Sequence, residues 1–396
     1  MGGRGLRRLV IEDYLGQRAR IYGGERAILI EVTPAGADAK ERLAELSALA
    51  ETAGVLPVAT ATQRRDRPDP ATYIGRGKVL EILALAQQVN ADTLIFGVEL
   101  TPAQARNLEE FTGLKIIDRS QLILDIFALH AGTKEAALAV ELAQLRYLLP
   151  RLRGWGQALS DPGGIVGTMG PGETRLEQSR RAIRRRIQAL ERELKEAERA
   201  REVRRARRRR FGPPEIALVG YTNSGKSTLF NALTHGDALV ADQLFATLDT
   251  KVRRFFLPDN RSALLTDTVG FIRDLPPQLI PAFHATLEAV REAALIVVVL
   301  DAASPAVFEH LRTVRRVLFE DLFGPEKQRP PIIYTLNKLD LLRTSEDWAR
   351  VEGLLLEAQP GLVISAKTGE NLPELSQLIA ELLPERSPLP ASVRYH

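Results

Sequence analysis

The chain has 396 residues, a length that predicts two or three domains. Of these residues, 45% are apolar and 26% are charged, a composition typical of soluble globular proteins. It contains no cysteine, which excludes disulfides, thiolate metal sites and a cysteine nucleophile. The longest apolar run, Ala293–Leu300, has eight residues, whereas a membrane span needs about twenty. No apolar signal segment follows the N-terminal arginines, so we predict a cytoplasmic protein with no membrane span.

The net charge of +4 at pH 7 is unevenly distributed along the chain. Residues 180–210 contain fifteen Arg and Lys against five Glu, a local charge of +10, so the remaining residues carry −6. A block this basic on an otherwise acidic protein indicates a polyanionic partner, with nucleic acid as the first candidate. The alternative interpretation is the solvated, charged face of a helix.

Short apolar runs alternate with helical patterns over the first third of the chain. This alternation predicts a small N-terminal parallel α/β domain over residues 1–132. Thr101 and Pro102 predict the start of one helix, as N-cap and first-turn proline. The predicted strands are 27–32, 55–60, 92–97 and 114–118, and the predicted helices are 38–53, 75–89 and 102–112.

The next two segments share apolar residues at offsets 0, 4, 7, 11 and 14, the narrow stripe of a coiled-coil seam. We therefore predict a long antiparallel helical hairpin over residues 133–210, in which the two stripes bury each other. Its tip, residues 153–172, contains seven glycines and is interpreted as a contact loop rather than a disordered linker. The stripes are Leu138, Leu142, Leu145, Leu149 and Leu152, and Ile183, Ile187, Leu190, Leu194 and Ala197.

A second, larger α/β domain is predicted over residues 211–384, followed by a tail at 385–396. Five apolar runs in this domain predict strands: EIALVG, SALLTDT, LIVVVLD, PIIYTLN and LVISA.

The first of these strands leads into a loop, Gly220–Ser227, that fits the pattern G-x-x-x-x-G-K-[ST] and opens a helix. Glycines in such a loop let backbone N–H groups turn toward phosphates, and the helix adds its positive dipole end. Lys226 is expected to reach the β- and γ-phosphates, and Ser227 to bind Mg²⁺. The predicted phosphate-binding residues are Gly220, Tyr221, Thr222, Asn223, Ser224, Gly225, Lys226, Ser227 and Thr228.

The nucleotide base is predicted from the sequence NKLD, which follows the strand PIIYTLN. Asp340 can accept hydrogen bonds from the N1 and N2 donors of guanine, whereas adenine has no donors on that edge. Asn337 is expected to contact the opposite edge of the base, and the stem of Lys338 to cover the ring. Ser365, Ala366 and Lys367 are expected to close the pocket. The sequence thus predicts that GTP and GDP bind and that ATP binds much more weakly.

Two more loops are expected to order around GTP and to be released after hydrolysis. In the first loop, Thr247 is the best candidate to close over the metal ion, beside Phe245 and Ala246. In the second, which contains Asp267, Thr268, Val269 and Gly270, Asp267 would hold Mg²⁺ through water and the Gly270 N–H would sense the γ-phosphate. The predicted catalytic residues are Lys226, Thr247 and Gly270, and the predicted metal ligands are Ser227 and Thr247.

Phe271 follows Gly270 at the position where Ras-like GTPases have a glutamine that orients water. A phenylalanine cannot orient a nucleophile. Intrinsic hydrolysis is therefore predicted to be slow unless a partner or another group completes the site. Asn223 either helps to hold a monovalent cation or stabilises the turn.

These motifs resemble the HflX family of ribosome-associated GTPases, in the Obg-HflX-like superfamily, over nearly the whole chain. The resemblance implies an N-terminal α/β domain, a long antiparallel helical hairpin and a Ras-like P-loop G domain. It also implies Mg²⁺-dependent GTP hydrolysis stimulated by the ribosome, binding to the large (50S) subunit and its rRNA, and dissociation of stalled or idle 70S ribosomes. It rests on GYTNSGKSTLFNALT, FATLD, DTVGFIRDLP, NKLD and SAK, and on DRSQLILDIFALHA, ELAQLRYLLPRL, GTMGPGETRLEQSRR and RPDPATYIGRGKVLEI.

The sequence departs from this family in two places. Met169 stands where the family usually has an arginine, and the small C-terminal domain of many relatives is expected to be absent. We expect a monomer. One alternative function is a nucleotide-regulated RNA chaperone in ribosome assembly. Another is a regulatory GTPase that binds a protein partner through the hairpin, which leaves the basic segment unexplained.

Overall fold

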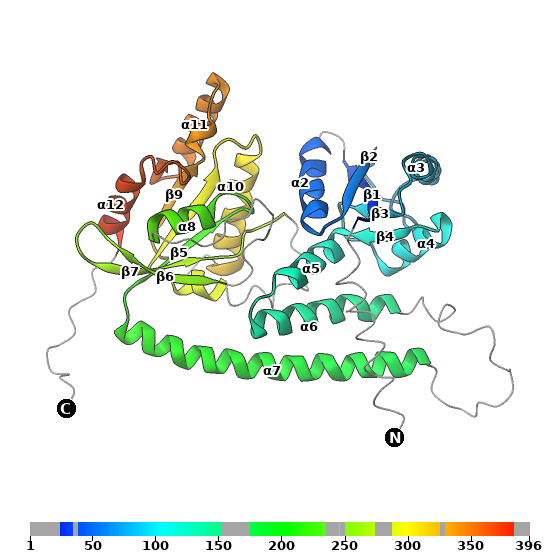
Figure 1. The fold of residues 1–396 in the computed structure, drawn as a ribbon, viewed down its shortest axis with the longest axis horizontal. Coiled ribbons are helices and arrows are strands. Elements are labelled where there is room, and N and C mark those ends of the chain that lie inside the picture. Colours follow the sequence, from blue (N-terminus) through cyan, green and yellow to red (C-terminus); the bar gives the residue numbers. More distant parts are fainter. Residues whose placement is uncertain are drawn as a thin grey trace. The chain divides into compact units, whose positions relative to one another are not determined.

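The computed structural model describes residues 24–34, 39–152, 175–234, 245, 250–273, 287–324 and 329–383 (Figure 1). The chain divides into two compact units, and the division falls between Glu198 and Arg199, inside one long helix. Each unit is described by itself below. The domain limits derived from the sequence stay predictions. In the described part of the chain, no helix is both long and apolar enough to cross a membrane.

The first unit contains a four-stranded parallel sheet in the order β2-β1-β3-β4, as predicted. Helices cover both faces of this sheet, so seven of the eight residues of β1 are buried. Helices α3 and α4 pack on the face that carries Ile28 and Phe96, and α2 and α5 pack on the other. The elements are β1 (Arg26–Thr33), α2 (Ala39–Thr52), β2 (Leu56–Arg64), α3 (Arg76–Val89), β3 (Thr93–Phe96), α4 (Pro102–Thr112), β4 (Lys115–Asp118) and α5 (Arg119–His130).

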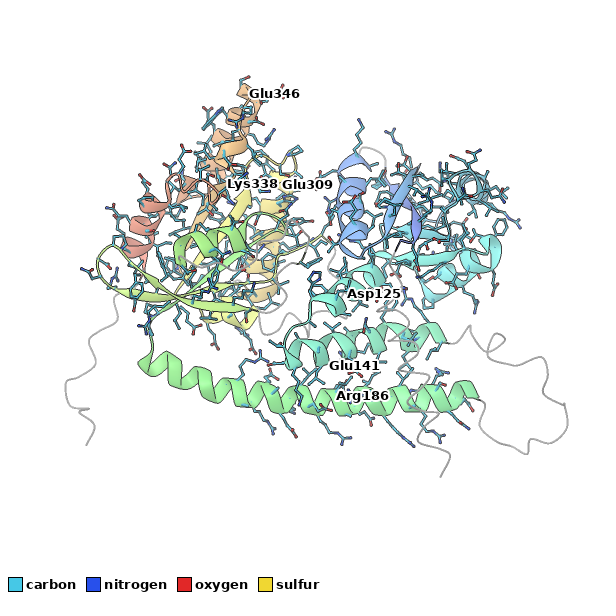
Figure 2. All side chains as sticks on the ribbon, in the orientation of Figure 1. Asp125, Glu141, Arg186, Glu309, Lys338 and Glu346 are labelled. Atoms are coloured by element: carbon cyan, nitrogen blue, oxygen red, sulfur yellow. The ribbon has the colours of Figure 1, made fainter. Side chains whose placement is uncertain are left out.

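The predicted helical hairpin consists of α6 (Lys134–Arg151) and the first part of α7 (Arg175–Phe211), which lie side by side (Figure 1). One apolar cluster joins them and contains every predicted stripe residue except Ala197. Figure 2 shows Glu141 and Arg186 facing each other across the seam, with Nε of Arg186 2.7 Å from the carboxylate of Glu141. The predicted glycine-rich tip lies outside the described residues.

The second unit is built on a six-stranded sheet in the order β10-β9-β8-β5-β7-β6, in which only β6 is antiparallel to its neighbour. Helices α10 and α11 cover one face, and α8 and α12 cover the other. The strands are β5 (Glu215–Gly220), β6 (Lys251–Phe256), β7 (Ser262–Asp267), β8 (Leu295–Asp301), β9 (Ile332–Asn337) and β10 (Gly361–Val363). The helices are α8 (Lys226–Thr234), α10 (Val307–Arg316), α11 (Ser345–Glu357) and α12 (Leu372–Leu382), with a π-helix at Val317–Leu322 and a 3₁₀ turn at Leu339–Leu341.

Strand β6 was not predicted from the sequence. It lies at the edge of the sheet and alternates exposed residues with partly buried or buried ones, leaving Val252 and Phe256 exposed. Basic and apolar side chains therefore share this strand, and the continuous apolar run that marks the central strands is absent. The five parallel strands end at one edge of the sheet, so the loops after them meet there.

Candidate nucleotide-binding site

The loop Gly220–Ser227 runs from the end of β5 into the start of α8, as its sequence predicts. Two of its glycines are required by close contacts. A Cβ at Gly220 would lie 2.2 Å from the carbonyl oxygen of Val299, and one at Gly225 would lie 2.2 Å from Nδ2 of Asn337. Gly225 also has a φ of +93°, a conformation that side-chain-bearing residues rarely adopt. The loop therefore packs closely against β8 and against the last residue of β9.

Lys226 is buried in this loop, where its Nζ donates a hydrogen bond to the carbonyl oxygen of Tyr221 at 2.7 Å. Burial lowers the pKa of Lys226 to about 8, and the nearby carboxylate of Asp267 only partly opposes that shift. The amine is therefore desolvated and fixed at the first turn of α8, where an anionic group would hold it in its charged form.

Two oxygen-bearing side chains lie together beside this lysine. The hydroxyl of Ser227 donates to Oδ2 of Asp267, the last residue of β7, at 2.7 Å. Hydroxyl and carboxylate oxygens are the donors that Mg²⁺ prefers, so these residues fit the predicted metal ion. Thr247, the other predicted metal ligand, lies outside the described residues together with Ala246.

The loop also presents side-chain oxygens without partners. Thr222 Oγ1 and Ser224 Oγ are buried, and neither oxygen has a hydrogen-bond partner within the described part of the chain. Buried polar groups are nearly always satisfied in native proteins, so these two oxygens are candidates for contact with a polar ligand. Of the other predicted residues, Asn223 is exposed, Thr228 is half-buried, and Phe245 and Val269 are buried.

The segment after β7 is bonded to the phosphate-binding loop through its backbone. The N–H of Phe271 donates to Gly220 at 2.9 Å, and the N–H of Thr222 donates to Phe271 at 2.7 Å. Thr268 adds a bond from its hydroxyl to the carbonyl oxygen of Leu218. A Cβ at Gly270 would lie 2.8 Å from the backbone Cα of Thr222, so glycine is required for this approach.

The side chain of Phe271 is 4% exposed and belongs to the apolar core beneath α10, where it packs with Val219 and Val307. The side chain of Phe271 therefore lies in the core and takes no position from which it could orient water. Its structural role is to hold the segment against the sheet.

We expect Phe271→Leu to keep the GTP hydrolysis rate within about threefold, because leucine preserves the apolar anchor. Phe271→Ala should instead lower the free energy of unfolding by about 3–5 kcal/mol through the cavity it leaves. Chemical denaturation and single-turnover hydrolysis measure the two effects. A folded, GTP-bound Phe271→Leu protein without activity would contradict this assignment.

The predicted base pocket is assembled around Asn337 at the end of β9. Its Nδ2 donates to the carbonyl oxygen of Ser224 at 2.9 Å, and its Oδ1 accepts from the N–H of Ala366 at 2.9 Å. Asn337 thus ties together the phosphate-binding loop and the loop after β10, a role that its predicted base contact did not include.

Asp340 is oriented for hydrogen bonding by Ser365, whose hydroxyl donates to Oδ1 of Asp340 at 2.7 Å. The same hydroxyl accepts from the N–H of Thr368 at 3.1 Å, which fixes Ser365 in turn. Lys367 is exposed. Lys338 directly follows the last residue of β9 (Figure 2). The carboxylate of Asp340 can still accept hydrogen bonds from a base.

Tyr221 belongs to the phosphate-binding loop, but its side chain contacts α10 and the segment after β7. Its ring stacks on His310 of α10 with centroids 3.9 Å apart, and its hydroxyl accepts from the N–H of Arg273 at 2.8 Å. An ion pair of 3.3 Å between Arg273 and Glu309 links the same segment to α10. Sequence reasoning missed these partners because they come from separate parts of the chain and carry no motif.

The fold and this arrangement of loops define a P-loop protein of the guanine-nucleotide-binding class. Family models match three parts of the chain: "GTP-binding GTPase N-terminal" at residues 40–128, "GTP-binding GTPase Middle Region" at 130–208 and "50S ribosome-binding GTPase" at 215–338. The chain is 50% identical over 318 residues to GTPase HflX of Caldanaerobacter subterraneus, covering 80% of this chain and 73% of that protein. It is 42% identical to GTPase HflX of Escherichia coli, over 92% of this chain and 84% of that protein.

The chain therefore belongs to the GTPase HflX family and is a GTPase. A crystal structure of SsGBP in complex with GDP is similar to it, with a TM-score of 0.52 and 30% identity, over 91% of this chain and 98% of that one. The family and the fold class predicted from the sequence are confirmed.

Proposed function

We propose that this GTPase binds the large ribosomal subunit and its rRNA in the GTP-bound state and separates stalled or idle 70S ribosomes into subunits. The match of residues 215–338 to a family model described as "50S ribosome-binding GTPase" supports binding to the large subunit. Contact with rRNA is supported by the distribution of charge on α7.

Exposed basic residues of α7 form a stripe along one side of the helix. At 100° per residue, their offsets of 0, 3, 4, 11 and 14 fall within about 100° of the circumference and span about 21 Å. The apolar seam residues Ile183, Ile187 and Leu190 lie on the opposite side. Although exposed Glu191 and Glu196 flank this stripe, its own basic side chains fit a row of phosphates, and the stripe is the observation that carries the proposal. Its members are Arg181, Arg184, Arg185, Arg192 and Lys195.

The same proposal assigns each residue of the candidate site a contact with the nucleotide or the metal ion. Lys226 and the N–H of Gly270 would contact the phosphates, while Asn337, Asp340 and Ala366 would surround guanine. Ser227, Thr247 and, through water, Asp267 would hold Mg²⁺, which neutralises phosphate charge when bound. Phe271 leaves the site without a water-orienting side chain, so we expect the ribosome to stimulate hydrolysis.

The test is co-sedimentation with ribosomes in a non-hydrolysable GTP analogue and in GDP, followed by sucrose-gradient analysis of 70S particles. We expect binding in the GTP analogue and conversion of 70S particles to subunits. Binding without conversion would favour the RNA-chaperone alternative, and equal binding in GDP would contradict the nucleotide switch.

Replacing Arg185, Arg192 and Lys195 with Gln is expected to weaken ribosome binding and to flatten its salt dependence. Each lost phosphate contact lowers the log–log slope by about 0.7–0.9, so the three changes should lower it by about 2. The control variant replaces Arg312, Arg316 and Arg343, exposed residues of the second unit, and removes the same charge. An unchanged slope in the stripe variant would show that the stripe is only a solvated helix face. The arginines at 204–210, which belong to the basic block 180–210, have side chains outside the described residues.

A further inference from the structure

Asp301 is the last residue of β8, the strand that lies between β5 and β9 in the sheet. Strand β5 leads into the phosphate-binding loop, and β9 ends at Asn337, which Lys338 follows. Asp301 pairs in register with Asn337, and the N–H of Ala302 donates to the carbonyl oxygen of Asn337 at 2.9 Å. The carboxylate of Asp301 is therefore placed between the phosphate half and the base half of the candidate site.

Both oxygens of this carboxylate have defined partners. Oδ1 accepts a hydrogen bond from the N–H of Ala303 at 3.0 Å, and Oδ2 lies 2.8 Å from Nζ of Lys338. The side chains of Asp301 and Lys338 are only 19% and 23% exposed, so the ion pair is largely shielded from water. The backbone N–H of Ala303 therefore holds the carboxylate of Asp301 in place, and this carboxylate in turn holds the amine of Lys338.

Lys338 needs such an anchor because of its backbone and its length. It adopts the left-handed conformation, with φ 70° and ψ 36°, which a non-glycine residue keeps only when its surroundings hold it there. Its four-carbon stem would otherwise sample many rotamers, and ordering it on ligand binding would cost entropy. The residue lies directly between Asn337 and Asp340, both proposed to contact guanine.

We propose that Asp301 is a positioning residue for guanine-nucleotide binding. Through its ion pair it holds the stem of Lys338 along the base side of the pocket, so that the Asn337–Asp340 loop is arranged before the nucleotide arrives. The inference rests on the proposed roles of Asn337, Lys338 and Asp340. Preorganisation of this kind acts mainly on the dissociation rate, and it acts equally on GDP and GTP, because neither residue is placed at the γ-phosphate.

The test compares Asp301→Asn, Lys338→Met and the double variant, with dissociation of a fluorescent GDP analogue and GTP hydrolysis as readouts. Each single variant should release GDP about tenfold faster, as loss of a charged hydrogen-bond pair predicts. The double variant should be no faster than Lys338→Met alone, because Asp301 acts through Lys338. For Asp301→Asn, KM for GTP should rise while kcat at saturating GTP stays within about twofold.

Glu357→Gln is the matched control, since it removes a carboxylate from an exposed ion pair with Arg315 at the end of α11. It should leave GDP release unchanged. Asp301→Glu keeps the charge and should restore slow release at least in part, which separates positioning from a folding defect.

Unchanged GDP release in Asp301→Asn, or additive effects in the double variant, would overturn the inference. Failure of the wild-type protein to bind GDP would instead contradict the proposed site itself. The two failures are therefore distinguishable.

Discussion

Lys226→Ala is expected to lower kcat/KM for GTP by at least about 10³-fold, because it removes the buried cation at the centre of the phosphate-binding loop. Single-turnover hydrolysis measures this loss. Lys134→Ala, an exposed lysine at the start of α6, is the control and should match the wild type. A folded Lys226→Ala protein that hydrolyses GTP at the wild-type rate would contradict the assignment.

The same lysine gives this prediction a pH signature. Because the pKa of Lys226 is lowered to about 8, the empty site loses its cation as the pH rises through 8. Bound phosphate would keep the amine charged, so GDP affinity should fall by up to about tenfold per pH unit above 8, with uptake of one proton on binding. Lys226→Ala should abolish this dependence. In the free protein the sign is opposite. The folded state binds fewer protons than the unfolded state between pH 8 and 10.5, so this group's contribution to stability rises with pH there.

Asp340→Asn is expected to reverse the base preference. Two charge-assisted hydrogen bonds of about 1.5–3 kcal/mol each would be lost, which lowers guanine-nucleotide affinity by roughly 10²–10⁴-fold. Xanthine carries an oxygen where guanine carries its exocyclic amine, so an amide at position 340 can donate to it. Ser365 can still donate to the remaining carbonyl oxygen at this position, because the wild-type contact of 2.7 Å is to Oδ1.

Competition between GDP, XDP and ADP for one site measures the change. Glu346→Gln, at the exposed start of α11, removes the same charge and should leave the preference for GDP intact (Figure 2). Equal competition by ADP and GDP for the wild-type site, or an Asp340→Asn protein that still prefers GDP, would contradict the base assignment.

Much of the fold follows from patterns that short stretches of sequence contain. The central strands are buried on both faces and therefore read as continuous apolar runs, and the seam of the hairpin repeats at heptad spacing. The edge strand β6 was not predicted because basic and apolar residues are mixed along it, with Phe256 exposed beside basic residues. Motif spacing likewise located the loops of the candidate site before the structure did.

What the sequence could not provide is the pairing of residues distant in the chain. Asp301 ends an apolar run like any other, and only the order of strands in the sheet brings it to Lys338. The ring of Tyr221 stands within the phosphate-binding motif but stacks on His310 of α10. A motif fixes which backbone approaches a ligand, whereas the direction of each side chain depends on neighbours that arrive from elsewhere.

The backbone bonds that join Phe271 to Gly220 and Thr222, together with the bond from Arg273 to the hydroxyl of Tyr221, fasten the start of the second switch loop at three points. Because these bonds hold residues 270–273 against the phosphate-binding loop, we expect this segment to shift little between the GTP- and GDP-bound states, so the release expected from the sequence would not begin at Gly270. A spectroscopic probe attached to this segment should therefore give nearly the same signal in both states.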